Sequence, residues 1–236
     1  RVTEVGSARL VGLGCEAVPR RGSVELLTYL QDTASGLVLA VGHEFTDPPE
    51  ESGTAPADFW QLAARPVLKG VSLAALGAGQ LQLKGGKRTP SSRLVPGRAQ
   101  FSFNPQSFQW ENLRSPVLVE DFAELSMRLA SAHPASLRPR RLGADLCVLR
   151  VAAITAAEYS DSDQTLYALL EDASENSATI ALPFSSRAAE GMDLLLPRLL
   201  TTPVSVRFVA GHVRLAGGVL QVRPVSVVVE ENGARK

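Results

Sequence analysis

The sequence predicts a mainly β protein with short helices, arranged as two similar five-stranded barrels joined by a helical connector. Three observations predict this fold class. Runs rich in β-branched and aromatic residues recur along the chain, each bounded by turn-forming residues. Short segments with helical spacing interrupt those runs. Two blocks of the first half also reappear about 140 residues later, which favours duplication of one unit.

The first unit contains a predicted hairpin. Residues 24–31 and 37–45 are β-rich runs, and the Asp-Thr-Ala-Ser-Gly segment between them supplies residues that favour turns. Three prolines in residues 46–56 exclude a regular element there. The remaining predicted elements are a short helix over residues 57–64 and strands over residues 67–75 and 79–84.

A different region separates the two units. Residues 101–103 and 108–110 alternate aromatic and polar side chains, which predicts an added hairpin around Asn104-Pro105. Residues 117–132 place apolar side chains at helical spacing, with acidic residues near the start, where the helix dipole favours them. Residues 135–143 are rich in proline and arginine and predict a linker.

The second unit repeats the pattern of the first. Its predicted strands are residues 147–154, 164–171, 178–184, 204–213 and 219–229. Turn residues 172–177 separate the second strand from the third and predict another hairpin. Residues 188–200 have the apolar content of a helix, which Pro197 ends or kinks.

The repeat is carried by two matches. Residues 26–32 align with 166–172, where both copies read Leu-x-Asp before a turn, and residues 79–84 align with 218–223. With the order strand, strand, strand, helix, strand, strand, each unit resembles the OB-fold, a small five-stranded Greek-key barrel. The resemblance implies OB-like barrels in residues 1–104 and 144–236, with residues 105–143 as connector. A pair of small barrels of another topology is the alternative.

Composition bounds the class of protein. The chain of 236 residues is 45% apolar and 20% charged, which is globular, and its zero net charge argues against broad wrapping in nucleic acid. No charge-free apolar run reaches about 18 residues, so no membrane span is expected. With two cysteines, Cys15 and Cys147, reduced thiols and a cytoplasmic setting are expected. Arg1 in place of an initiator methionine is expected for a trimmed chain or a piece of a longer one.

A basic segment is the first candidate site. Residues 84–98 carry five cations and no acid, and they lead into aromatic residues. Cations contact phosphates and aromatic rings stack on bases, as single-stranded nucleic acid requires. Arg20 and Arg21 occupy the loop between strands one and two, a ligand loop in OB-folds. The candidate nucleic-acid-binding residues are Arg20, Arg21, Lys84, Lys87, Arg88, Arg93, Arg98, Phe103, Phe108 and Trp110. The alternative is a solvated loop whose aromatic residues belong to the core.

Two further charged stretches are candidate sites. Residues 158–175 contain acids and no bases, but Asp161 and Asp163 lack the glycine and terminal glutamate of a calcium loop. We therefore expect a solvated face or a docking contact there, and no metal site. The arginines of residues 138–141 form either a soluble linker or a contact for phosphate or an acidic partner.

Enzymatic motifs are absent from the sequence. His43, His133 and His212 have no ligand spacing, and no nucleophile elbow occurs. We therefore expect a non-catalytic binding module without cofactor or metal. One hypothesis is single-stranded nucleic-acid binding through the first barrel. The other is a scaffold or accessory subunit of a larger bacterial assembly, with a protein partner on the barrel edges or on residues 117–132. Both hypotheses stay open.

Overall fold

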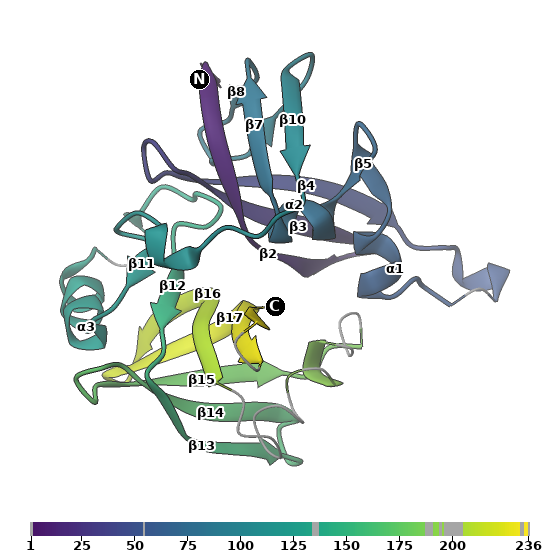
Figure 1. The fold of residues 1–236 in the computed structure, drawn as a ribbon. Helices are drawn as coiled ribbons and strands as arrows, with labels where there is room; N and C mark the ends of the chain where they lie inside the picture. The colour runs from purple at the N-terminus through teal and green to yellow at the C-terminus, as the bar shows by residue number, and fades with distance from the viewer. Residues whose placement is uncertain are drawn as a thin grey trace. The chain divides into compact units, whose positions relative to one another are not determined.

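The computed structural model describes residues 2–53, 55–133, 137–186, 191–193, 195, 205–231 and 234–235. The protein is mainly β, as predicted (Figure 1). The described residues form two compact units. The first contains residues 2–109, 140–144 and 186, and the second contains the others. Most of the segment predicted as a separate connector, residues 105–143, therefore belongs to the second unit.

The first unit is built on a five-stranded antiparallel sheet, with strand order β10-β7-β2-β3-β4. A three-stranded sheet, β1-β8-β9, lies beside it. The strands of the larger sheet are β2 (Ser7–Arg20), β3 (Ser23–Asp32), β4 (Val38–Thr46), β7 (Gln80–Lys84) and β10 (Gln100–Asn104). Those of the smaller sheet are β1 (Thr3–Glu4), β8 (Lys87–Arg88) and β9 (Leu94–Val95).

The predicted hairpin over residues 24–45 is confirmed as β3 and β4, which pair antiparallel. Asp32 ends β3 and shapes the turn, because its carboxylate accepts hydrogen bonds from the backbone N–H groups of Ala34 and Ser35. Buried side chains of both strands, with Leu10 of β2 and Leu81 of β7, form the core of this unit.

Two glycines let a helix pack directly against the sheet. Helix α2 (Leu73–Ala78) lies against β2. A Cβ atom at Gly12 of β2 would overlap the backbone carbonyl of Gly77 in α2, so the close approach requires glycine.

The strand predicted over residues 67–75 is wrong. The chain forms two short strands, β5 (Pro66–Leu68) and β6 (Val71–Ser72), and then turns into α2. Lys69 and Gly70 reverse the chain with positive φ, and the Ser72 hydroxyl caps α2 by accepting from the Ala75 N–H at 3.2 Å. The predicted helix at 57–64 is confirmed as α1 (Phe59–Ala63), which follows the 3₁₀ turn η1 (Glu50–Ser52).

The aromatic hairpin predicted around Asn104-Pro105 is also wrong. β10 pairs with β7, while the second predicted arm begins a 3₁₀ helix, η2 (Trp110–Asn112). The Asn104 side chain accepts from the Gln106 N–H at 3.0 Å, which turns the chain away from β10.

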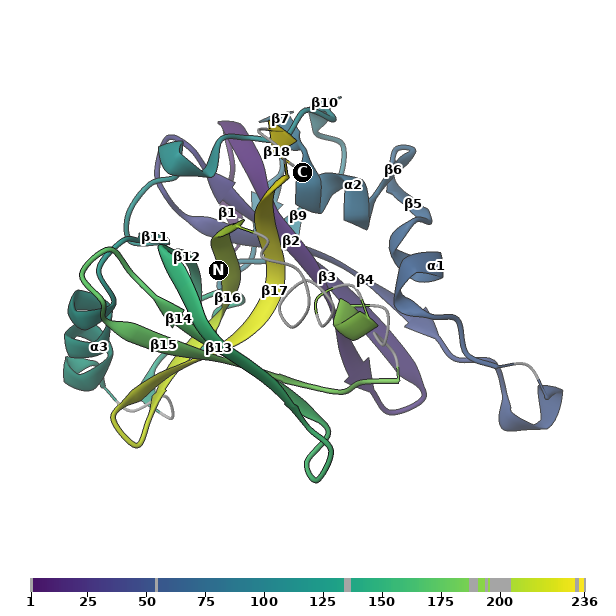
Figure 2. The ribbon, with the colours of Figure 1, turned by 60° about the horizontal axis from the view of Figure 1, so that its bottom comes forward.

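The second unit is one extended sheet with the order β11-β12-β16-β17-β15-β14-β13, and β18 pairs with β17. Figure 2 shows β13, β14 and β15 side by side, and β15 pairs in parallel with β17. Its strands are β11 (Leu118–Val119), β12 (Leu146–Arg150), β13 (Ala153–Ser160), β14 (Thr165–Glu171), β15 (Ser177–Pro183), β16 (Ser205–Ala216), β17 (Val219–Glu231) and β18 (Ala234–Arg235).

One chain segment supplies strands at both sides of this sheet. The strand predicted over residues 147–154 is divided into β12 and β13. At the division, two consecutive N–H groups donate to different neighbouring strands. The Val151 N–H donates to Arg207 and the Ala152 N–H donates to Glu171, both to backbone carbonyls. Within the described residues no ladder joins the ends of the sheet in either unit. The two closed five-stranded barrels are therefore not confirmed.

The helix predicted over residues 117–132 is shorter than expected. Residues 118–119 form β11 instead, and helix α3 (Phe122–Ser131) begins after the N-cap Asp121. Phe122 and Leu125 of α3 are buried in the core of the second unit. Most of the helix predicted over residues 188–200, Pro197 included, lies outside the described residues.

The internal repeat is supported in one block only. Strands β3 and β14 hold equivalent places, because each is the central strand of three consecutive antiparallel strands. Residues 79–84 and 218–223 are not equivalent. β7 pairs antiparallel with β2, the strand that precedes β3, whereas β17 pairs in parallel with β15, the strand that follows β14.

Candidate functional site

A groove on the first unit gathers part of the predicted basic segment. It lies where β1, the β7–β8 turn and the segment after β9 meet, near the strand ends at the top of Figure 1. Three cations, Lys84, Lys87 and Arg98, line it together with one acid, Glu4. The other lining residues are Val5, Gly6, Ser7, Gly85, Gly86, Val95, Pro96, Gly97, Ala99 and Gln100.

Glycines and short strands shape this groove. Gly85 and Gly86 both have positive φ and make the turn that separates Lys84 from Lys87. The β1 segment is held against this turn, since the Val5 N–H donates to Gly86 O at 2.9 Å and the Gly85 N–H donates to Gly6 O at 2.7 Å. This turn, together with the pairing of β8 and β9, brings Lys84, Lys87 and Arg98 to one surface.

The three cations of the groove are available to a ligand. Lys84, Lys87 and Arg98 are exposed, and their side chains have no hydrogen bond or ion pair with any described residue. Arg88 follows Lys87 in β8, is only partly exposed and does not line the groove. Adjacent strand residues point to opposite faces, which separates Arg88 from Lys87.

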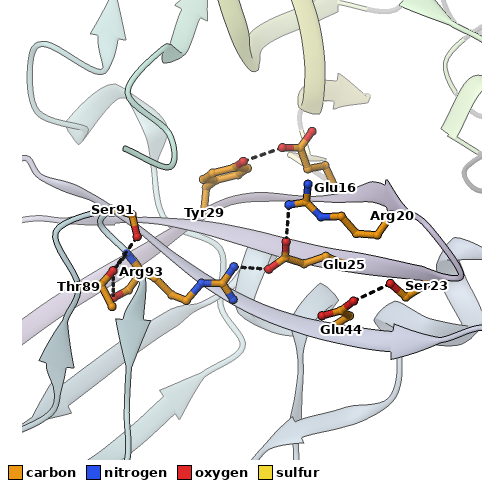
Figure 3. Close-up of polar contacts among 9 residues, drawn as sticks. All are labelled: Glu16, Arg20, Ser23, Glu25, Tyr29, Glu44, Thr89, Ser91 and Arg93. Carbon is orange, nitrogen blue, oxygen red and sulfur yellow. Dashed lines mark hydrogen bonds and ion pairs between the residues drawn. The ribbon is translucent and has the colours of Figure 1, made fainter. Parts of the chain in front are cut away.

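Arg20 and Arg93 are engaged in ion pairs within the first unit. Both guanidinium groups form ion pairs with the buried Glu25 carboxylate of β3, as Figure 3 shows; the Arg20 pair measures 2.8 Å. Arg21 is exposed at the turn between β2 and β3 and does not line the groove.

The predicted base-stacking residues differ in their exposure. Trp110 is buried in the second unit, where it packs edge-to-face on Phe208 with ring centroids 6.2 Å apart. Phe103 packs on the core of the first unit and covers Gly79, where a Cβ would lie 2.6 Å from its ring. Phe108 is half-buried. The tryptophan that is exposed is Trp60 of α1.

Sequence reasoning missed one cation beside the groove. Lys69 donates a hydrogen bond of 2.8 Å to the carbonyl of Ala99, a lining residue, and its ammonium lies 5.2 Å from the ring centroid of Phe101. The signal in the sequence is the Lys69-Gly70 pair, a turn signal lying far from the basic segment.

The acidic stretch of the second unit has structural uses. Asp163 accepts a hydrogen bond from the Tyr167 hydroxyl at 2.6 Å. Asp172 is buried at the β14–β15 turn and accepts from the Phe122 N–H at 2.7 Å. Burial raises the pKa of Asp172, but the hydrogen bonds from Phe122, Asn176 and Ser174 outweigh it, so this pKa lies below its ordinary value.

The described residues contain no group of three or more His, Cys, Asp or Glu side chains able to hold a metal ion. Cys15 and Cys147 are free thiols, and burial raises the pKa of each to about 11, so both stay protonated at neutral pH. None of the described helices has the length and apolar character needed to cross a bilayer.

The comparisons with known proteins define the class. Residues 143–234 match the model of the YehQ C-terminal OB-fold domain, so this is an OB-fold protein and its second unit is the OB-fold domain. Over 223 residues the chain is 26% identical to Protein YehQ of Escherichia coli (strain K12). That match covers 92% of this chain and 35% of YehQ, so the chain spans about a third of that relative's length.

Solved structures match the chain at low similarity. The chain resembles the Ifi202 HINa domain in complex with 20bp dsDNA, with a TM-score of 0.40, 9% identity and coverage of 99% of this chain and 97% of the other. It resembles a replication protein A heterotrimer bound to ssDNA, with a TM-score of 0.38, 9% identity and coverage of 98% and 49%. Likeness at this level carries no argument about function.

Proposed function

We propose that this OB-fold protein is a non-catalytic binding module whose first unit binds single-stranded nucleic acid by its phosphates. One observation supports the proposal: Lys84, Lys87 and Arg98, which pair with no described residue, converge on one glycine-lined groove. Flexible cationic side chains around exposed backbone suit a chain of phosphates. Glu4 lowers the net charge of the groove to about plus two, which favours modest affinity.

The proposed binding is independent of base sequence. Phosphate contacts position a strand without reading its bases, and of the predicted stacking residues Trp110 is buried and Phe103 is half-buried against the core. Affinity then depends mainly on counterion release. Three phosphate contacts give a slope of about −2 for log affinity against log salt concentration. Raising salt from about 50 to 200 mM should therefore weaken binding roughly twentyfold.

The test is fluorescence anisotropy with a labelled oligonucleotide of about 30 nucleotides at both salt concentrations. The triple variant Lys84→Gln, Lys87→Gln, Arg98→Gln should bind at least about tenfold more weakly at low salt, with a slope near zero. The chain supplies a matched control, because Arg138, Arg140 and Arg141 are equally exposed and carry the same charge. Their triple glutamine variant should bind like the wild type. Equal losses in the two triple variants would contradict the groove.

A protein-interaction scaffold is the second candidate. It is favoured by the burial of Trp110, which removes the aromatic part of the nucleic-acid hypothesis, and by the exposed Met127 on α3. If wild-type protein binds no oligonucleotide at low salt, this candidate takes precedence. Substitution Met127→Glu should then release a partner recovered by pull-down, whereas the groove variant should retain it.

A further inference from the structure

Glu25 joins two elements of the first unit that are distant in sequence. Its carboxylate lies on β3, is buried, and is held between the guanidinium groups of Arg20 and Arg93 (Figure 3). Burial raises the pKa of Glu25, but hydrogen bonds from Arg20 and Arg93 outweigh it, and this pKa lies below its ordinary value. The carboxylate is therefore charged at neutral pH.

Arg93 carries this anchor to the β8–β9 hairpin. Its backbone N–H donates to the Thr89 hydroxyl at 3.0 Å, and the Thr89 N–H donates to the Arg93 carbonyl at 2.9 Å. The next residue toward the turn, Ser92, accepts from the Ala40 N–H of β4 at 3.0 Å. The hairpin is thus attached to β3 through a side chain and to β4 through the backbone.

The same hairpin forms one wall of the groove. Lys87 of β8 pairs directly with Val95 of β9, and both line the groove. Arg98 follows Val95 by one short turn. A displacement of Arg93 would therefore be passed to Lys87 and to Arg98, which are the cations proposed to contact phosphates.

The path of the Arg93 side chain is kept open by a glycine. A Cβ atom at Gly42 of β4 would lie 2.7 Å from the Leu27 side chain, 2.8 Å from an Arg93 guanidinium nitrogen and 3.2 Å from a Glu25 carboxylate oxygen. Gly42 has no positive φ that would require glycine for backbone reasons. The space above Gly42 is shared by Leu27 and the Arg93–Glu25 ion pair.

We propose that Glu25 is a positioning residue: by holding Arg93, it fixes the β8–β9 hairpin so that Lys87 and Arg98 present their charges together to a phosphate chain. This inference rests on the proposed function. Glu25 touches no ligand and acts through the geometry of the groove. A groove arranged before binding does not lose affinity to the ordering of its own loops.

The direction of the change in affinity distinguishes a positioning role from the simple removal of a charge. Removing an acid near an anion site strengthens anion binding when charge alone acts. Positioning predicts the opposite, so Glu25→Gln should weaken binding of a 30-nucleotide strand about fivefold at low salt. Glu44→Gln is the matched control, because Glu44 lies on β4 of the same sheet, is exposed, and accepts a hydrogen bond from the Ser23 hydroxyl at 2.6 Å. It should bind as tightly as the wild type or more tightly.

Two further measurements separate positioning from general damage. In an Arg93→Gln background, Glu25→Gln should cause no additional loss, because the two residues act as one contact. Gly42→Ala changes no charge and should weaken binding by a similar factor. Full additivity of Glu25→Gln and Arg93→Gln, or tighter binding by Glu25→Gln, would overturn the proposal.

Amide hydrogen exchange on the unliganded protein tests the Glu25–Arg93 anchor independently of nucleic-acid binding. Glu25→Gln should speed exchange in residues 85–98 while leaving β14 and β17 of the second unit unchanged. Faster exchange with no oligonucleotide binding in the wild type supports the anchor and refutes the nucleic-acid ligand. Unchanged exchange in residues 85–98 refutes the anchor, whatever the wild type binds.

Discussion

Asp172 offers the sharpest test of how the second unit is held together. Its Oδ1 atom accepts the N–H groups of Ser174 and Asn176 at 2.8 and 2.9 Å. Its Oδ2 atom accepts the Phe122 N–H at 2.7 Å and the Asn176 side-chain amide at 3.0 Å. One carboxylate therefore satisfies the β14–β15 turn and the first residue of α3 together.

Asp172→Asn should destabilise the second unit by about 3 kcal/mol, because an amide places an NH₂ group against two of these donors whichever way it is oriented. Each buried donor left without an acceptor costs about 1–3 kcal/mol. The loss of negative charge at the N-terminus of α3 adds a smaller term of about 0.5 kcal/mol.

Asp32→Asn is the matched control, since it changes the same Leu-x-Asp motif in the first unit. The Asp32 carboxylate is partly exposed and its backbone partners, Ala34 and Ser35, lie at 3.3 Å. Water can replace these contacts, so the cost should stay below about 1 kcal/mol.

The assay is equilibrium urea unfolding in a Trp60→Phe background. Trp60 is exposed, so its replacement is cheap, and the remaining Trp110 is buried in the second unit and reports on it alone. Far-UV circular dichroism follows the whole chain. Equal losses in the Asp32 and Asp172 variants, or an Asp172→Asn cost below about 1 kcal/mol, would refute the account of a shared buried acceptor.

Three further predictions concern the packing at Gly12, the stability at acid pH and the reactivity of Cys147. Gly12→Ala should cost about 3 kcal/mol in the first unit, measured by urea unfolding, because α2 must move away from β2. Gly6→Ala is its control, because a Cβ atom at Gly6 of the same unit would meet no atom within 4 Å. The melting temperature should be constant above about pH 4–5 and fall as the pH drops through the lowered pKa values of Asp172 and Glu25. Asp172→Asn should reduce this dependence of the melting temperature on acid pH. The same acid profile in the variant and the wild type would contradict the prediction. Cys147 should react slowly with a thiol reagent at pH 8 and rapidly in urea; fast reaction of the native protein would contradict its buried, raised-pKa environment.

Local patterns predicted the elements that depend on neighbouring residues. The hairpin of β3 and β4 and the strands β14 to β17 follow from β-rich runs between turn residues, and α1 follows from a short apolar segment capped by Asp58. The strand predicted over residues 67–75 failed because a β-rich composition does not reveal the positive φ of Lys69 or the capping role of Ser72.

Only part of the candidate site could be predicted, because whether a cation can bind a ligand depends on side chains that are distant from it in the sequence. Lys87 and Arg93 look alike in the basic segment, yet Arg93 is bound to Glu25, a residue of β3, whereas Lys87 has no ion pair with any described residue. Phe103 and Trp110 have the alternation of a stacking surface, but Trp110 is buried against Phe208, and Phe103 is half-buried over Gly79. None of these partners is adjacent in sequence.

By itself, the sequence determined the β-rich class, the turns, and the OB-fold resemblance, because these follow from short-range periodicity and backbone preference. Tertiary structure alone decided which charges face solvent. Ion pairing requires two groups to meet in space. The pairing of β3 with β4, and the bridge between Ala40 of β4 and Arg93, bring Glu25 and Arg93 together. Around the groove, Lys84, Lys87 and Arg98 have no partner among the residues that the structure describes.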